Sequence, residues 1–192
     1  MAEVAGTLID TVLRRVRDPG GAAHPRALVR DLLSQVQRLV NAARRDVLVE
    51  VAFTTEPNRL VYPMTSHPDL ATSIRIEAIR DDDRVLPRVS WESIHAHDHR
   101  WFRKVRDQFD AWAPVGRDLF VIYPAKSTAS TVTIIATKLT DPLTTDASAT
   151  ELPDQRLPAV RDFVEGLLLA RHRLLTSMVP VRGRFTTHLE AE

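Results

Sequence analysis

The 192-residue sequence contains no cysteine and only six glycines. The absence of cysteine excludes disulfide scaffolds, thiolate metal sites and cysteine nucleophiles together. The glycines form neither a P-loop nor a dinucleotide-binding fingerprint, and no Gly-x-Ser-x-Gly or His-Glu-x-x-His motif is present. We therefore expect a protein that is not an enzyme and that binds no cofactor.

An excess of charge of one sign is also lacking. The sequence has 26 Lys and Arg residues against 25 Asp and Glu residues, so the formal net charge is +1. This balance gives no global field that would attract nucleic acid or an anionic membrane. No apolar run reaches the length of a transmembrane helix, and the N-terminus lacks the features of a signal peptide. We expect a protein that is made and used inside a cell, without lipid.

Three segments carry apolar residues at the spacing of amphipathic helices. They span residues 4–17, 25–45 and 157–175. Pro25 and Pro158 suit the first turn of a helix, where a missing N–H costs little. Pro19, followed by two glycines, ends the first helix. Because each helix must bury its apolar stripe, the sequence predicts a small antiparallel helical bundle.

Between the second and third helices, the apolar period changes to the alternation of β-strands. Strand candidates span residues 47–53, 59–62, 73–80, 85–89, 118–123 and 131–139, and Ser90 caps a short helix at residues 91–98. This order predicts an α+β fold with an antiparallel β-rich segment inserted into the bundle. The predicted domains are the N-terminal helices at 1–46, the β-rich insertion at 47–150, the C-terminal helix at 151–176 and a tail at 177–192.

The tail contains Pro180 and Gly183 and shows no helical stripe, so we expect it to be extended. A frayed terminus is one interpretation of such a segment. The alternative is a tail that a partner orders, with apolar anchors and arginine contacts. The candidate partner-binding residues are then Val179, Pro180, Val181, Arg182, Arg184 and Phe185.

The most conspicuous polar cluster is His95-Ala96-His97-Asp98-His99. Imidazoles and carboxylates are good zinc ligands. The cluster is one residue shorter than the His-x-His-x-Asp-His run of metallo-β-lactamase-like hydrolases. On a helix, His97 would point away from the face that His95 and His99 share. A metal-dependent hydrolase is therefore an alternative function, whereas a solvated polar stretch is the favoured interpretation and no metal site is predicted.

A second alternative comes from a basic, aromatic stretch. Arg100, Arg103, Lys104 and Arg106 alternate with Trp101 and Phe102, a pattern typical of single-stranded nucleic-acid binding. The balanced overall charge disfavours this function. We expect the nearby aromatic side chains to cover the core of the sheet, namely Trp91, Trp101, Phe102, Trp112 and Tyr123.

The layout of the whole chain resembles the adaptor, or head-to-tail connector, proteins of tailed bacteriophages, of the podophage type. The resemblance is carried by LLSQVQRLVNAARRDV, RDLFVIYPA, TVTIIATKLT and TDASATELPDQRLPAVRDFVEGLLLAR. These segments give two helices, a β insertion, a linker with a Glu-Leu-Pro-Asp sequence and a final helix. The resemblance lies in this arrangement, which spans most of the chain, and in no single motif.

The resemblance implies a virion structural protein that is assembled in the host cytoplasm and lies at the head–tail junction. It implies a ring of this chain, typically a dodecamer, between the portal protein and the tail nozzle or tube protein. DNA would pass non-specifically through its channel during ejection, and Val179 to Phe185 would contact the portal. No catalytic residues carry over from this group. The near-neutral charge suits a channel that must not retain phosphates.

Overall fold

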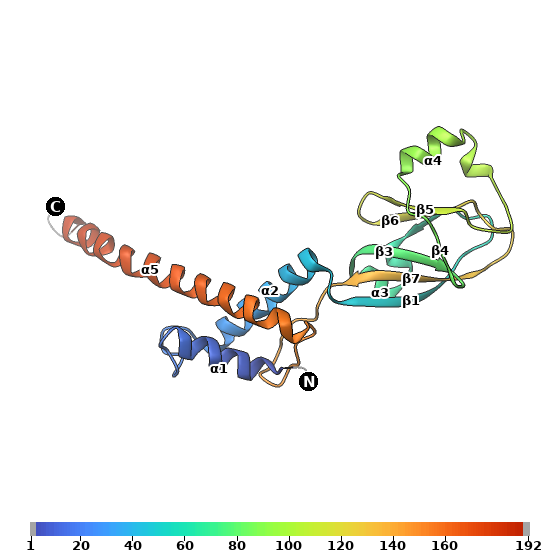
Figure 1. Ribbon diagram of the computed structural model, residues 1–192. Helices are drawn as coiled ribbons and strands as arrows, with labels where there is room; N and C mark the ends of the chain where they lie inside the picture. Colours follow the sequence, from blue (N-terminus) through green and yellow to red (C-terminus); the bar gives the residue numbers. More distant parts are fainter. Residues whose placement is uncertain (1–2, 190–192) are drawn as a thin grey trace. The chain divides into compact units, whose positions relative to one another are not determined.

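The computed structural model describes the backbone of residues 3–189 and the side chains of residues 3–173. The chain forms two compact units. The helical unit comprises Met1–Arg44 and Thr140–Glu192, and the β unit comprises Arg45–Leu139. Figure 1 shows helices in the first unit and antiparallel sheets in the second, which confirms the predicted α+β fold class.

The helical unit contains three long helices. They are α1 (Ala5–Arg15), α2 (Arg26–Arg44) and α5 (Leu157–Leu189), the last preceded by the 3₁₀ turn η3 (Asp154–Arg156). Both α1 and α2 pack against α5 (Figure 1). The three apolar stripes meet in the interior, where the fully or almost fully buried side chains are Leu8, Ile9, Val12, Leu13, Val29, Leu33, Val36, Leu157, Val160, Val164 and Leu168. Each such burial stabilises the bundle by about 1.5–3 kcal/mol before entropy is subtracted.

The connection between α1 and α2 is organised by Asp18. Its carboxylate accepts hydrogen bonds from the backbone N–H groups of Ala22, Ala23 and His24, at 2.9, 3.0 and 2.7 Å. Gly21 adopts a φ of 67°, a left-handed conformation that glycine reaches without a steric penalty. The Pro-Gly-Gly segment therefore turns the chain where the sequence predicts it.

The C-terminal helix is longer than predicted. α5 continues to Leu189, whereas the sequence predicts that the helix ends near residue 175 and that an extended tail follows. The expectation of an extended tail is wrong for residues 177–189, because the backbone remains helical through Pro180 and Gly183. Extending a helix that has already formed costs less than starting one, so an upstream helix can carry residues of low propensity.

Within the helical unit, buried polar groups of α2 hold the linker from Thr140 to Thr150. The Gln37 side chain donates a hydrogen bond to the carbonyl oxygen of Asp141 at 2.8 Å, and the Ser34 hydroxyl accepts one from the Leu143 N–H at 3.2 Å. These contacts explain the burial of Ser34 and Gln37, two of the three polar residues on the buried side of α2.

The β unit contains two antiparallel sheets. The four-stranded sheet has the order β1 (Leu48–Thr54), β7 (Thr131–Lys138), β3 (Ser73–Asp81) and β4 (Arg84–Val85). The three-stranded sheet has the order β2 (Val61–Pro63), β6 (Leu119–Tyr123) and β5 (Ala111–Val115). Two short helices, α3 (Pro68–Ala71) and α4 (Trp91–His97), and two 3₁₀ turns, η1 (Met64–Ser66) and η2 (Trp101–Arg103), complete the unit.

Residues from both sheets form the main core of the β unit. Its largest buried side chains are Trp112, Tyr62, Phe109, Phe120, Ile79, Leu70, Leu86 and Ile122. The Phe53 ring packs edge-on against Tyr62 at 5.1 Å and against Phe120 at 5.5 Å, so aromatic side chains from both sheets are in contact. The sequence predicts that Trp91, Trp101, Phe102, Trp112 and Tyr123 cover the core. Trp112 and Tyr123 are buried, and Trp91 and Trp101 are half-buried against a second core cluster. The prediction is wrong for Phe102, which is 53% exposed.

The strand candidates predicted from the sequence omit β5. Pro114 lies within β5, and proline normally argues against a strand. The N–H of Trp112 donates to the carbonyl oxygen of Pro87 at 3.0 Å, away from β6. Because Pro114 is two residues further on, its missing N–H also faces away from β6 and breaks no hydrogen bond of that pair.

Candidate interaction surfaces

The five-residue histidine cluster lies at the end of α4, which Ser90 caps by accepting a hydrogen bond from the Ser93 N–H at 3.1 Å. The rings of His95 and His99 are 6.0 Å apart between centroids, in an edge-on arrangement. His97 lines a cavity that neither of them lines. Within the part of the chain that the structure describes, no three histidine or carboxylate side chains converge on a position that could hold a metal ion. The geometry therefore gives no support to a metal-dependent hydrolase.

Asp98 is the acidic member of the cluster, and it is engaged elsewhere. Its carboxylate pairs with the Lys104 ammonium at 3.1 Å and accepts hydrogen bonds from the Tyr123 hydroxyl and the Arg100 N–H, both at 2.9 Å. The hydrogen bond from Lys104, with those from Arg100 and Tyr123, lowers the pKa of Asp98 from 3.8 to about 2. The residue ties α4 to strand β6 and is not a metal ligand in this arrangement.

A cavity of about 440 Å³, here called the His97 cavity, lies beside α4. It is lined by Val89, Ser93, Ile94, His97, Lys104, Arg106, Asp110, Ala111 and Tyr123. Its two cations already have carboxylate partners, since Lys104 pairs with Asp98 and Arg106 pairs with Asp110 at 3.1 Å. An anionic ligand would have to compete with a carboxylate at each cation, so the cavity is not an open anion site.

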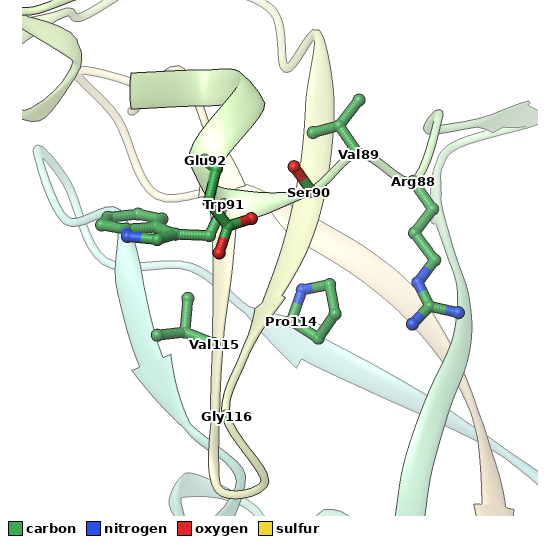
Figure 2. Close-up of a pocket in the computed structure, with 8 residues that line it drawn as sticks. All are labelled: Arg88, Val89, Ser90, Trp91, Glu92, Pro114, Val115 and Gly116. Atoms are coloured by element: carbon green, nitrogen blue, oxygen red, sulfur yellow. The ribbon is translucent and has the colours of Figure 1, made fainter. Parts of the chain in front are cut away.

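A second cavity of about 430 Å³ lies between the start of α4 and the end of β5. Figure 2 shows its lining residues, Arg88, Val89, Ser90, Trp91, Glu92, Pro114, Val115 and Gly116. Trp91 and Arg88 lie on opposite sides of Pro114 in this view. The Trp91 ring also packs edge-on against Trp101, with 4.4 Å between centroids. The polar side chains of this cavity are Arg88, Ser90 and Glu92, and the Ser90 hydroxyl is engaged in capping α4.

The basic, aromatic stretch does not form a continuous cationic surface. The Arg103 guanidinium lies over the Phe102 ring at 5.4 Å, and the Lys104 ammonium lies over the Tyr123 ring at 5.5 Å. Arg106 is paired with Asp110. Two of the four cations, Lys104 and Arg106, are paired with the carboxylates of Asp98 and Asp110, which reduces the positive charge that this stretch could offer to a nucleic acid.

Helix α5 has two contrasting exposed sides. One carries Asp162 and Glu165, whose carboxylates bind the Arg15 guanidinium at 2.6 and 3.4 Å. The other side is here called the apolar flank and consists of Ala159, Phe163, Gly166, Leu167 and Ala170. Because successive residues of an α-helix are rotated by about 100°, these five uncharged residues fall within one sector of about 100° around the helix axis. The Phe163 side chain is 56% exposed and that of Leu167 is 40% exposed. The two large apolar side chains of this flank therefore lie next to each other on the surface of the helix.

The tail residues that the sequence proposes as partner contacts lie near the end of α5. The backbone of residues 179–185 is helical, but their side chains are outside the described part of the chain. Figure 1 shows that the second half of α5 projects beyond α1 and α2. None of the described helices is long and apolar enough to cross a membrane.

Residues 5–176 match the family of the SU10 adaptor protein. None of the curated proteins matches the chain. The family match includes all of the β unit and the helical unit from α1 to the first half of α5, so it covers both parts of the fold. It agrees with the resemblance to phage adaptors that the layout of the sequence suggests. The chain belongs to the SU10 adaptor protein family and is a structural adaptor protein of a bacteriophage virion.

Proposed function

We propose that this adaptor forms a ring, typically of twelve copies, between the portal protein and the tail nozzle or tube protein of a podophage-type particle. The observation that carries the proposal is the family match across residues 5–176, which spans both units. In this ring, DNA passes through the central channel during ejection.

The apolar flank of α5 supports contact between neighbouring copies in the ring. Phe163 and Leu167 are large, exposed and adjacent on the helix surface, being four residues apart. The opposite side of the same helix is held by Arg15 within the chain. A neighbouring copy that packs on the flank buries apolar surface without breaking an internal ion pair.

The projecting end of α5 is the proposed portal contact. Val179, Pro180, Val181, Arg182, Arg184 and Phe185 lie on this part of the helix. An amphipathic helix can bind in an apolar groove of a partner, with arginines at the rim. This helical segment replaces the extended tail that the sequence suggests. Val181 and Phe185, four residues apart, would share one side of it, whereas Val179 would lie away from that side.

The charge of the chain supports passage of DNA without retention. The net charge is +1, and Arg26, Arg15 and Arg80 are paired with carboxylates in the folded chain. A channel that neutralised many phosphates would bind DNA strongly at low salt. We therefore expect weak binding of double-stranded DNA, with a shallow dependence on salt.

The experiment that tests this function measures native mass for the purified chain alone and with the portal protein encoded in the same genome. Formation of a many-copy complex only when both proteins are present supports the ring. A chain whose mass is unchanged by the portal protein contradicts it.

A further inference from the structure

Strand β1 lies at the free edge of the four-stranded sheet, next to β7 (Figure 1). It is seven residues long, so it presents an edge of about 23 Å. An edge strand leaves half of its backbone N–H and C=O groups without partners in its own sheet. In β1 these free groups can be identified from the pairing with β7.

The register pairs Leu48 with Thr137, and so on to Thr54 with Thr131. Just outside these limits, the Lys138 N–H donates to the Val47 carbonyl at 3.1 Å and the Thr55 N–H donates to the Ser130 carbonyl at 2.8 Å. In an antiparallel pair, hydrogen bonding to the neighbour alternates along the strand. The odd-numbered residues of β1 therefore bond β7, and the backbone groups of Leu48, Glu50, Ala52 and Thr54 point to the free edge.

The outward N–H and C=O groups of these four residues have no backbone hydrogen-bond partner within the part of the chain that the structure describes. Their side chains are exposed as well, with Leu48 53% exposed. Natural edge strands are usually protected by proline, lysine, a bulge or a very short length. β1 has none of these, and its register with β7 runs without the irregularities found between β3 and β7.

The side chains on the two faces of β1 determine which side chains an added neighbouring strand would contact. On the core face, Val51 and Phe53 are buried and Val49 is half-buried. On the other face, Glu50 is the only charge of the strand, and it is paired with Arg80 at 2.9 Å. A matching segment is therefore extended and free of proline, with apolar side chains on the face that continues the core.

None of the other edges of the two described sheets offers a free strand long enough to pair with all of β1. Among the described strands, β4 has two residues and β2 has three, whereas the outer side of β5 already bonds Pro87 and Val89. Pairing of β1 with β1 of a second copy is two-fold, and a two-fold contact joins two copies and cannot continue around a ring. Length and symmetry therefore argue against a sheet edge of another copy of this chain as the occupant.

We propose that the free edge of β1 binds an extended segment of about seven residues from a different virion polypeptide, which adds as a fifth strand to this sheet. The main-chain groups of Leu48, Glu50, Ala52 and Thr54 supply the hydrogen bonds. This interaction goes beyond the proposed ring and portal contact, because it assigns a separate surface on the β unit to a separate partner.

Hydrogen–deuterium exchange with single-residue resolution tests the edge directly. The exchange of the full chain is measured free in solution, self-associated at high concentration, and in purified phage particles. In particles, we expect the amides of Leu48, Glu50, Ala52 and Thr54 to slow about tenfold or more. The amides of the odd-numbered residues are slow in all three states and serve as an internal control. Equal exchange of the four amides in the free chain and in particles overturns the proposal.

The identity of the occupant is tested by photo-cross-linking, which the lack of native cysteine makes specific. Ala52→Cys carries a benzophenone maleimide at the β1 edge, and Val85→Cys carries the same group at the opposite edge, on β4. Irradiation of particles is expected to join the Ala52→Cys chain to a different polypeptide, identified by its mass. An adduct of two copies of this chain, or protection in the self-associated chain alone, overturns the proposal.

A backbone variant separates the edge from the fold. Ala52→Pro removes an N–H that points to the free edge and leaves every hydrogen bond between β1 and β7 in place. Ala52→Val is the control, because valine retains this N–H. We expect Ala52→Pro to enter particles several-fold less than Ala52→Val. Equal incorporation contradicts the proposal.

Failure of the ring and failure of the edge proposal give different results. If the wild-type chain fails to join the portal protein, the proposed ring is wrong. If it joins and the β1 amides still exchange freely in particles, only the edge proposal is wrong.

Discussion

The Tyr123 hydroxyl donates a hydrogen bond of 2.9 Å to the carboxylate of Asp98, which links strand β6 to the residue that ends α4. Lys104 adds an ion pair to the same carboxylate at 3.1 Å. This arrangement places Asp98 in a structural network. It also gives the carboxylate a measurable signature, because the hydrogen bond from Lys104 and those from Arg100 and Tyr123 lower its pKa from 3.8 to about 2.

Asp98 is expected to stabilise the fold in a defined pH range. A carboxylate whose folded pKa is lowered contributes stability that is present above pH 3.8 and is lost as the pH falls to about 2. Asp98→Asn should therefore lower the thermal midpoint of the β unit at pH 6, and the difference from the wild type should shrink at pH 2.5. A difference that stays the same at both pH values would show that the carboxylate charge has no stabilising role.

Adjacent residues of β7 should differ strongly in their effect on stability. The Ile134 side chain is fully buried in the main core, whereas that of Ile135 is half-buried on the opposite face. Ile134→Ala should cost about 2–5 kcal/mol and Ile135→Ala about 1 kcal/mol or less. The check is urea unfolding followed by tryptophan fluorescence, because all three tryptophans lie in the β unit. Equal losses would mean that the two faces are packed alike.

The apolar flank of α5 should control assembly of the ring. Phe163→Glu places a charge on this flank, where a neighbouring copy would have to bury it at a cost of several kcal/mol. We expect this variant to remain folded and to form no many-copy complex with the portal protein. Leu169→Glu is the matched control, since Leu169 is similarly exposed but lies on the side that carries Asp162 and Glu165. If both variants assemble as the wild type does, copies do not meet at the flank.

The end of α5 should be needed for the portal contact and not for folding. A chain that ends after Leu175 keeps every buried residue of the bundle within residues 3–173, whose side chains the structure describes, and the last of these on α5 is Leu168. We expect this truncated chain to retain its thermal midpoint within a few degrees and to lose binding to the portal protein. A control chain that lacks only residues 190–192 should bind normally. Binding by the chain truncated after Leu175 would place the portal contact elsewhere.

The helices α1 and α2 and the strands β1, β3, β6 and β7 could be predicted because their patterns are local. Val29, Leu33 and Val36 recur at helical spacing, and Val51 and Phe53 alternate with exposed residues. Strand β5 could not be predicted, because its proline is tolerated only where the missing N–H faces away from β6. That condition depends on pairing, and a single segment does not reveal it.

The polar sites were harder to predict for the same reason. The spacing of His95, His97 and His99 suggests a possible ligand set, and it correctly separates His97 from the other two rings. The partner of Asp98 that fixes its role is Tyr123, which is 25 residues away in sequence and becomes adjacent only through the fold. The free edge of β1 likewise follows from strand order, which an alternating pattern alone does not give.

The most direct test of the adaptor ring is the native mass of this chain with and without the portal protein. The account predicts a small species for the chain alone and a complex with many copies, close to twelve, when the portal protein is added. A monomer or dimer that keeps its mass in the presence of assembled portal would contradict the central claim.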